Sequence, residues 1–204
     1  PNTVTSLGVY AFHLCADLTT FTFAVGSTLT TIETNGFRWS GLTTFELPNT
    51  VTSLGAYAFM NCADLTTFTF AVGSTLATIG TAVFYQSGLT TLELPKTVTS
   101  LGTHAFYKCA DLTMFTFAAG TTLATIGNNA FDQSGLTTFD FFAIGCASAP
   151  TLGVVVFDGT AFSAVALQSD WPCGKTCADV DSSGNVEIPK EMTAIVEYAF
   201  YGCT

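Results

Sequence analysis

The sequence predicts a mostly β solenoid of stacked repeats, with a parallel sheet on one wall and short strands or helical turns on the other. Residues 1–8 recur almost unchanged at 48–55 and 95–102, which gives a period of 47 residues. Each period divides into alternating units of 24 and 23 residues, which begin at Leu18, Leu42, Leu65, Leu89, Leu112 and Leu136. A repeat of this length is typical of units that bury their apolar faces by stacking on their neighbours.

Each unit opens with a short segment in which apolar and polar residues alternate. In Phe21-Thr22-Phe23 the period of two places both phenylalanines on one face of a strand. A strand this short cannot bury that face alone, so we expect strands of successive units to stack at a spacing of about 4.8 Å. Phe21, Phe45 and Phe68 should then lie one above another in the core.

A second apolar element follows about a dozen residues later in each unit. One form of it is Leu54-Gly55-x-x-Ala58-Phe59-x-x-Cys62. We expect this element to form a short helical turn that places its phenylalanine in the core from the wall opposite the sheet.

The full motif is Leu-Pro-x-x-Val-Thr-x-(Ile/Leu)-Gly-x-x-Ala-Phe-x-x-Cys, and residues 94–109 carry all of it. It resembles the BspA-like leucine-rich repeat family over residues 1–141 and again over 186–204. The resemblance implies a leucine-rich-repeat solenoid, and an extracellular or cell-surface protein with a role in adhesion.

The regularity of the pattern divides the chain into three parts of one continuous solenoid. Residues 1–141 hold the regular repeats, residues 142–185 hold degenerate units and a projecting loop, and residues 186–204 return to the regular repeat. No polar cap is visible in the sequence at either end. We therefore expect either a piece of a longer polypeptide or copies that stack end to end.

The composition excludes several classes of partner. With 15 acidic and 5 basic residues and a net charge of −10, the chain cannot neutralise many phosphates, which disfavours nucleic acid and anionic membranes. No apolar run approaches the roughly 20 residues of a membrane-spanning helix. The two histidines, His13 and His104, occupy structural positions and no paired carboxylates are apparent, so we do not expect an enzyme.

The outward positions of the predicted sheet are the candidate binding residues. Threonines recur there, and Glu46, Glu93 and Asp140 fall in one column of alternate units. The candidate set is Thr20, Thr22, Thr44, Glu46, Thr67, Thr69, Thr91, Glu93 and Asp140. Solvation and the preference of threonine for strands would also explain these residues.

The cysteines fall into two groups. Cys15, Cys62 and Cys109 are two coils, or about 10 Å, apart, which is too far for a disulfide, so we expect buried free thiols. Cys173 and Cys177 lie in the predicted loop and Cys146 in the other irregular segment, so we expect a disulfide either between Cys173 and Cys177 or between Cys146 and the loop.

The same loop contains a possible calcium site. Asp179, Asp181, Ser183 and Glu187 have the spacing of the first ligands of an EF-hand loop, with Gly184 at the turn. Lys190 stands where the last, bidentate glutamate should be, so a simple polar turn is the alternative. Calcium is the only cofactor that the sequence suggests.

The predicted function is a non-enzymatic interaction or adhesion scaffold at the cell surface that binds a protein or a glycan. One alternative is a structural subunit of an extracellular fibre built by end-to-end stacking. A lesser alternative is ice binding through regular threonine rows.

Overall fold

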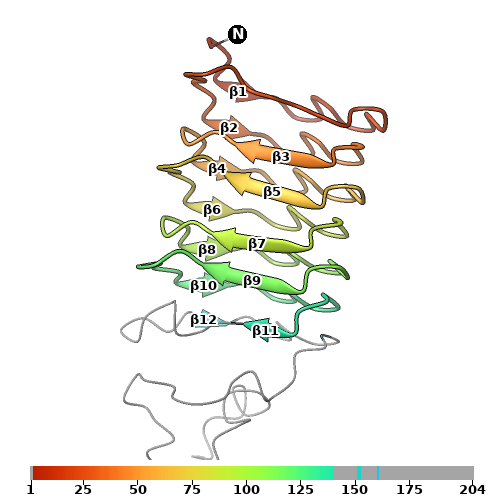
Figure 1. Ribbon diagram of the computed structural model, residues 1–204, viewed down its shortest axis with the longest axis vertical. Coiled ribbons are helices and arrows are strands. Elements are labelled where there is room, and N and C mark those ends of the chain that lie inside the picture. Colours follow the sequence, from red (N-terminus) through yellow and green to blue (C-terminus); the bar gives the residue numbers. More distant parts are fainter. Residues whose placement is uncertain (1, 140–150, 153–159, 161–204) are drawn as a thin grey trace, which may run out of the picture.

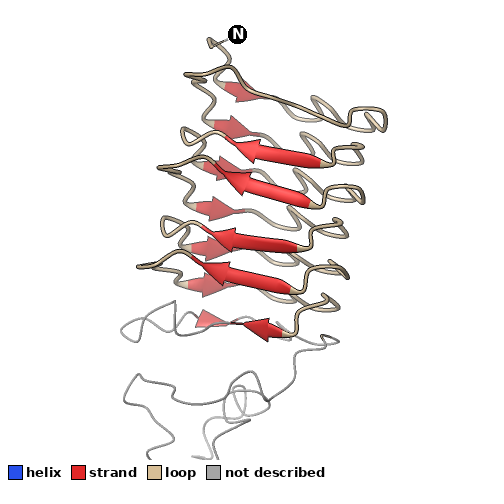
Figure 2. Cartoon of the chain, viewed as in Figure 1, coloured by secondary structure: helices blue, strands red, loops and turns tan. Residues whose placement is uncertain are grey.

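The computed structural model describes residues 2–139, 151–152 and 160, and in this part the chain winds into a parallel β-solenoid. The coils stack along one axis, and their short strands form two sheets on different walls of the solenoid (Figures 1 and 2). The predicted fold class is confirmed.

Sheet A runs the length of the described stack and consists of seven two-residue strands. Their order is β1 (Ser6–Leu7), β2 (Thr31–Ile32), β4 (Ser53–Leu54), β6 (Thr78–Ile79), β8 (Ser100–Leu101), β10 (Thr125–Ile126) and β12 (Thr151–Leu152). Every pair is parallel and in register. In β1 to β10 of this sheet, a leucine or isoleucine therefore points into the core while a serine or threonine points outward.

Sheet B covers another side of the coil with longer strands. It contains β3 (Thr44–Leu47), β5 (Thr67–Phe70), β7 (Thr91–Leu94), β9 (Met114–Phe117) and β11 (Thr138–Phe139). In β3 and β7 the burial alternates strictly between exposed and buried residues, as the period of two predicts.

The third wall is formed by consecutive turns, and the expectation of a short helical turn around Phe59 is wrong. Tyr57 and Asn61 adopt left-handed backbone conformations, with φ of 61° and 59°, which interrupt any helix. The amides of these two residues and of Phe59 donate to carbonyls of the next coil at 2.8–2.9 Å. Bonds between coils therefore alternate with local bonds of the turns, such as the one from the Met60 amide to the Tyr57 carbonyl at 3.2 Å, and the described residues contain no helix.

The core is organised around a stack of six phenylalanine rings on the third wall. Successive rings lie 5.0–5.7 Å apart with interplanar angles of 4–13°, and the stack consists of Phe12, Phe37, Phe59, Phe84, Phe106 and Phe131. The rings of sheet B meet this stack edge to face, as Phe45 does with Phe59 at 4.8 Å. The prediction that Phe21, Phe45 and Phe68 stack is confirmed, with centroid separations of 6.3 and 5.5 Å.

The close approach of coils requires glycine at one corner. A Cβ built on Gly88 would lie 2.0 Å from the carbonyl oxygen of Ala63 in the preceding coil, and Gly41 and Gly135 are equally constrained. These glycines occur only in coils whose corner reads Ser-Gly-Leu. The other coils read Cys-Ala-Asp-Leu, which is one residue longer at this corner.

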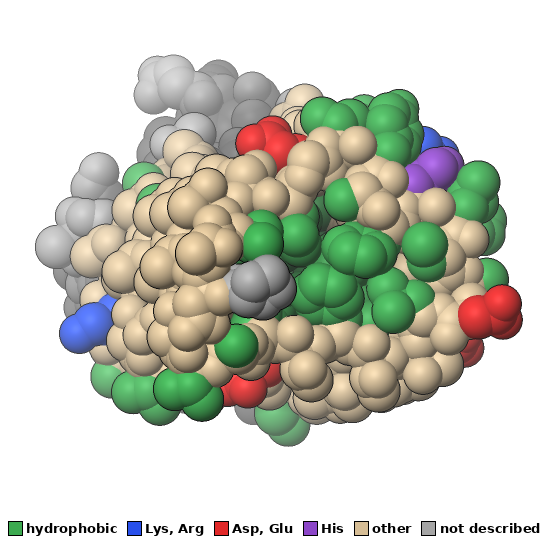
Figure 3. Space-filling model, turned by 90° about the horizontal axis from the view of Figure 1, so that it is seen from above, with side chains coloured by type: hydrophobic (Ala, Val, Ile, Leu, Met, Phe, Trp, Pro, Cys, Tyr) green, Lys and Arg blue, Asp and Glu red, His purple; other side chains and the backbone are tan. Residues whose placement is uncertain are grey.

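The first described coil leaves part of its apolar interior uncovered. Viewed from above, hydrophobic side chains gather in the middle of this end (Figure 3). The partly exposed apolar side chains that pack on the core here are Leu7, Phe12, Leu18, Phe21 and Phe23, whereas the equivalent Phe59 and Phe68 are buried.

Several sequence predictions fall outside the described residues. These are Asp140, the Cys173–Cys177 pair, the calcium ligands Asp179, Asp181, Ser183 and Glu187, the return to the regular repeat at 186–204, and most of 142–185. They stay predictions.

The phenylalanine stack generates a stability prediction. Phe84 is fully buried, stacks on Phe59 and Phe106 and contacts Phe68 edge to face at 4.9 Å. We expect Phe84→Ala to lower the free energy of unfolding by about 3–5 kcal/mol, because the cavity interrupts the stack on both sides. Urea denaturation followed by circular dichroism measures this loss. Val72→Ala is the matched control, since Val72 is 96% exposed; an equal effect of the two changes would contradict the role of the stack.

Candidate functional site

The outer face of sheet B displays two rows of polar side chains that run along the solenoid axis. The pairing of the strands aligns Thr20, Thr44, Thr67, Thr91 and Met114 in one row, which we call the threonine row. The backbone of Thr138 continues its register. Two residues further along each strand, Glu46, Thr69, Glu93 and Thr116 form the alternating row. The structure thus brings the predicted site residues of the described part together on one face. Asp140 lies outside the described residues.

The candidate side chains on this face are exposed and available to a ligand. The hydroxyls of Thr44, Thr67, Thr69 and Thr91 have no hydrogen-bond partner among the described residues. The only charged side chains in the two described rows are the carboxylates of Glu46 and Glu93. The face therefore combines free hydroxyls with negative charge.

A different set of threonines, on the corners of the coils, does have partners. The hydroxyls of Thr43, Thr66, Thr90, Thr113 and Thr137 each donate to the carbonyl of the equivalent threonine one coil earlier, at 3.3–3.4 Å. On another corner, Thr30 donates in the same way to the Thr5 carbonyl at 2.9 Å. Sequence reasoning did not separate these ladders from the free rows.

The strands of sheet B pair completely at every second junction only. β3 and β5 pair over four residues, as do β7 and β9, whereas the pairing of β5 with β7 is confined to Thr67 and Thr91. The first coil likewise meets β3 only at the Thr20–Thr44 bridge. Figure 1 shows the wider separation of β5 from β7.

A proline lies beyond the last paired residues at each incomplete junction. At the complete junctions Ala71 and Ala118 donate their amides to Leu47 and Leu94, which extends the ladder beyond the strands. At the incomplete junctions the corresponding positions are Pro48 and Pro95, which have no N–H to donate. The sequence thus contains the signal for these openings, although sequence reasoning missed it.

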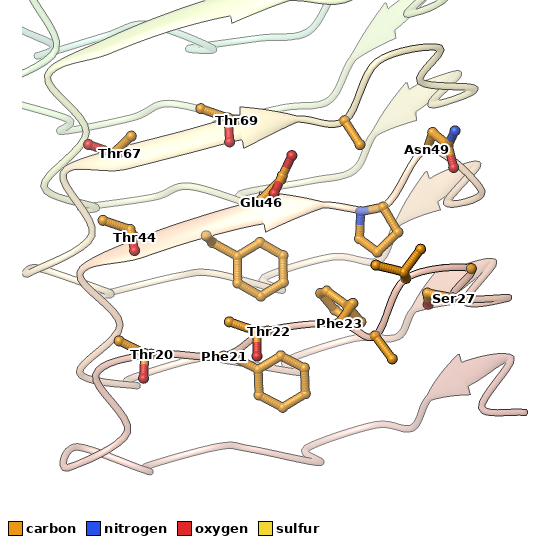
Figure 4. A pocket seen from close by; sticks show the side chains of 16 residues that line it. Thr20, Phe21, Thr22, Phe23, Ser27, Thr44, Glu46, Asn49, Thr67 and Thr69 are labelled. Carbon is orange, nitrogen blue, oxygen red and sulfur yellow. The ribbon is translucent and has the colours of Figure 1, made fainter. Parts of the chain in front are cut away.

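The first incomplete junction forms an open pocket of about 700 Å³ on the outer face. Six of the predicted binding residues line it, namely Thr20, Thr22, Thr44, Glu46, Thr67 and Thr69. Figure 4 shows Glu46 on β3 between Thr22 of the first coil and Thr69 of β5. Thr91 and Glu93 are not among the residues that line this pocket; they lie on β7, beside the next incomplete junction.

The pocket also has an apolar side, which sequence reasoning did not predict. It is lined there by Phe21, Phe23, Ala24, Val25, Pro48 and Ala71. Val25 is 97% exposed, because it sits at the tip of a turn that Gly26 closes with φ of 77°.

The three described cysteines are free thiols, as predicted, but only Cys62 and Cys109 are buried, where they form part of a polar column, while Cys15 in the first coil is half-buried. Cys62 Sγ donates to the Phe37 carbonyl at 3.1 Å and lies 3.4 Å from Ser40 Oγ. Cys109 repeats this arrangement with Phe84 at 2.9 Å and Ser87 at 3.4 Å. Burial raises the pKa of the Cys62 thiol, and it raises the pKa of Cys109 to about 11. These thiols are structural groups with little tendency to react.

The turns of the third wall display aromatic side chains without forming a chemical site. Tyr10, Trp39, Tyr57 and His104 all lie in left-handed turns, and His104 contacts Tyr107 edge to face. The two histidines are half-buried, and His13 Nδ1 lies 3.1 Å from the Arg38 carbonyl.

Within the described ranges, no three side chains of His, Cys, Asp or Glu come close enough together to hold a metal ion. Nor does any helix of the described part have the length and apolarity to cross a membrane.

The repeat pattern matches the model of the BspA type leucine rich repeat region, in six copies, over residues 1–71, 30–160 and 175–204. The chain belongs to this family. No curated protein matches this chain.

Solved structures share its fold. A leucine-rich repeat protein from Eubacterium ventriosum is similar with a TM-score of 0.63 and 24% identity, over 80% of this chain and 42% of that one. One from Bacteroides ovatus has a TM-score of 0.60 and 21% identity, over 77% and 45%. The pneumococcal vaccine antigen PcpA has a TM-score of 0.55 and 24% identity, over 78% and 34%. The chain therefore spans less than half the length of these proteins.

The buried thiols generate a pH prediction. The unfolded Cys109 thiol ionises near its ordinary pKa of 9.0, while the folded thiol stays neutral until about pH 11. The contribution of this thiol to the free energy of unfolding is fully present below pH 9. It falls by about 3 kcal/mol as the pH rises toward 11. Urea midpoints at pH 8 and pH 10.5 should differ more in the natural protein than in Cys109→Ser, which copies Ser87 and Ser134 of the alternate coils. An identical pH dependence in the two proteins would contradict the buried neutral thiol.

Proposed function

We propose that this BspA-type leucine-rich repeat protein is a non-enzymatic scaffold at the cell surface that binds a protein partner through the outer face of sheet B. The observation that carries the proposal is the pair of exposed rows, in which free threonine hydroxyls and two carboxylates are held by a rigid sheet. A surface held by stacked coils is already ordered before binding, which lowers the entropic cost of association.

Family membership and the similarity to a vaccine antigen support the surface location. The chemistry of the described residues supports a binding role, because no nucleophile lies beside a base and an orienting group in the rows or the pocket.

The charge of the face indicates what kind of protein it binds. Glu46 and Glu93 are the only charged groups in the two described rows, and the whole chain carries a net charge of −10. A basic partner would be attracted over long distances and would find carboxylates at the contact. We therefore favour a basic protein over a neutral glycan, which the threonine hydroxyls alone would suit equally well.

The two other functional hypotheses stay predictions. The exposed apolar end in Figure 3 is compatible with end-to-end fibre assembly, but a further coil of the same repeat in the chain would cover the same surface. Ice binding would use the threonine row, but Met114 interrupts that row and Glu46 and Glu93 interrupt its neighbour.

An oligolysine peptide is a suitable probe for the proposed face. We expect the double change Glu46→Gln and Glu93→Gln to weaken its binding about five- to tenfold, about 1–1.4 kcal/mol, because two charge pairs at an exposed surface are lost. Isothermal titration at about 50 mM and about 200 mM salt measures this, and raising the salt should weaken the natural protein more than the variant.

Glu33→Gln is the matched control for this experiment. Glu33 follows β2 of sheet A and accepts a hydrogen bond from Thr31 at 3.4 Å, so Glu33→Gln changes the net charge by as much as either single change, Glu46→Gln or Glu93→Gln, without touching sheet B. If Glu33→Gln weakens binding as much as either sheet B change, the peptide is responding to overall charge, and the proposed face is wrong.

A further inference from the structure

The pocket at the first incomplete junction places a carboxylate next to an apolar surface. Glu46 is the only charged side chain among the residues that line it, and the exposed threonines Thr22 and Thr69 lie on either side of it (Figure 4). Where the strands end, the lining becomes apolar with Phe23 and Pro48. The volume of about 700 Å³ lies in the range of pockets that take a ligand group. The pocket therefore suits a group that has a cation at one end and an apolar stem.

Aromatic rings line the opening between the first coil and β3. Phe21 and Phe23 are half-buried there, and Phe45 forms the back of the pocket with an exposure of 2%. The rings of Phe21 and Phe45 are 6.3 Å apart across this junction, compared with 5.5 Å for Phe45 and Phe68 across the complete junction. A cation held at this opening gains attraction from the faces of the rings in addition to the attraction of the carboxylate.

Arginine meets these requirements more completely than lysine does. Its guanidinium is planar and weakly hydrated, stacks on aromatic rings and has five N–H donors, whereas the lysine ammonium is a compact, strongly hydrated charge. The fork of donors can bond both oxygens of one carboxylate and still serve a neighbouring hydroxyl. We infer that this pocket is the anchor site of the face and binds an arginine side chain of the basic partner, with the guanidinium at Glu46 and the stem against Phe23 and Pro48. This inference rests on the proposed function of sheet B.

The second incomplete junction provides a comparison within the same molecule. Each of the 16 residues that line the first pocket has an equivalent 47 residues later, and all but three of these equivalents are identical. The three differences are Leu92 in place of Phe45, Lys96 in place of Asn49, and Met114 in place of Thr67. Lys96 adds a competing positive charge, and Met114, which is 53% exposed, is a longer side chain than threonine. We therefore expect arginine to bind beside Glu46 in preference to Glu93.

Three small amides test the chemistry of the pocket. N-acetyl-arginine amide carries the proposed side chain, N-acetyl-lysine amide carries the other cation, and N-acetyl-citrulline amide is a neutral molecule of nearly the same shape as the first. Two-dimensional NMR of the threonine methyl groups locates and measures binding. We expect the arginine amide to shift the signals of Thr22 and Thr44 before those of Thr91 and Thr116, and to bind at least about threefold more tightly than the lysine amide. The citrulline amide should cause no shift.

Glu46→Gln removes the carboxylate from the pocket. We expect it to weaken binding of the arginine amide at least about fivefold, because the charge-assisted hydrogen bonds are lost. Glu33→Gln is again the matched control for the change of net charge and should preserve the binding. If both variants weaken it equally, the pocket is not the binding site.

Exchanging residues between the two junctions tests the lining. Asn49→Lys combined with Thr67→Met copies the second junction and should weaken binding of the arginine amide at least about fivefold. Met114→Thr combined with Lys96→Asn copies the first junction and should create a second site, seen as shifts of the Thr91 signal. Each of these side chains already occurs at the equivalent place in the stack, and circular dichroism confirms that the variants are folded. If neither exchange changes binding, the inference is wrong.

The source of the arginine is tested with a Gly-Gly-Arg-Gly-Gly peptide. We expect this peptide to shift the same signals as the arginine amide with similar affinity. If the amide binds and the peptide does not, the ligand is a small guanidinium compound and the assignment to a protein partner is wrong.

The remaining outcomes separate the inference from the proposed function. Equal binding of the arginine and lysine amides, shifts caused equally by the citrulline amide, or no shift of Thr22 with any amide would overturn the arginine site. In each of these cases the proposed face stands if the oligolysine peptide still binds less tightly to the double variant Glu46→Gln and Glu93→Gln. The proposed face fails if that peptide does not respond to the double variant.

Discussion

The stack of phenylalanine rings on the third wall is the constraint on which the rest of the structure depends. Six rings from successive coils lie nearly parallel, 5.0–5.7 Å apart, and each is held edge to face by the residues of sheet B where those are aromatic. Parallel rings at this spacing leave no room for a coil to tilt or slip by one residue. This packing fixes the register of the sheets, and the register of the sheets fixes the alignment of the outer rows.

Because the interior fixes the spacing, the exterior is free to vary from coil to coil. Leu92 replaces the phenylalanine found at Phe68 and Phe115, and β7 still pairs with β9 over four residues, while serine alternates with cysteine in the buried polar column. Pro48 and Pro95, in contrast, have no N–H, so the bond that Ala71 and Ala118 donate at the complete junctions is absent at the incomplete ones. The openings on the outer face thus arise from the backbone, while the charge beside them arises from side chains two residues earlier.

The features that follow from a period of two or of 47 could be predicted from the sequence. These include the column of Phe21, Phe45 and Phe68, the separation of Cys62 from Cys109, and the outward direction of Glu46 and Glu93. Each depends only on which residues are equivalent in successive coils.

The conformation of the third wall could not be predicted in the same way. The spacing of Ala58, Phe59 and Cys62 suits one turn of a helix as well as it suits consecutive β-turns. The structure adopts the turns because alternate amides, such as those of Tyr57 and Phe59, can then donate to the next coil. Placing Tyr57 and His104 in left-handed conformations costs about 1 kcal/mol or more for each residue, and the bonds between coils compensate for it. The sequence pattern of one unit does not predict the stabilisation by these hydrogen bonds, because the bonds form between two units.

Threonine shows how the same residue type takes two roles that the sequence alone does not distinguish. At the corners, the hydroxyls of Thr66 and Thr90 donate hydrogen bonds to the preceding coil, so these hydroxyls already have partners within the protein. One residue later, Thr67 and Thr91 point outward from the ladder and keep their hydroxyls free. A threonine pair in each unit therefore supplies one structural group and one binding group. A substitution at the first position would act on the stability of the stack, and a substitution at the second would act on recognition. The position of a threonine relative to the start of its strand, and not the number of threonines, determines what the face of sheet B can bind.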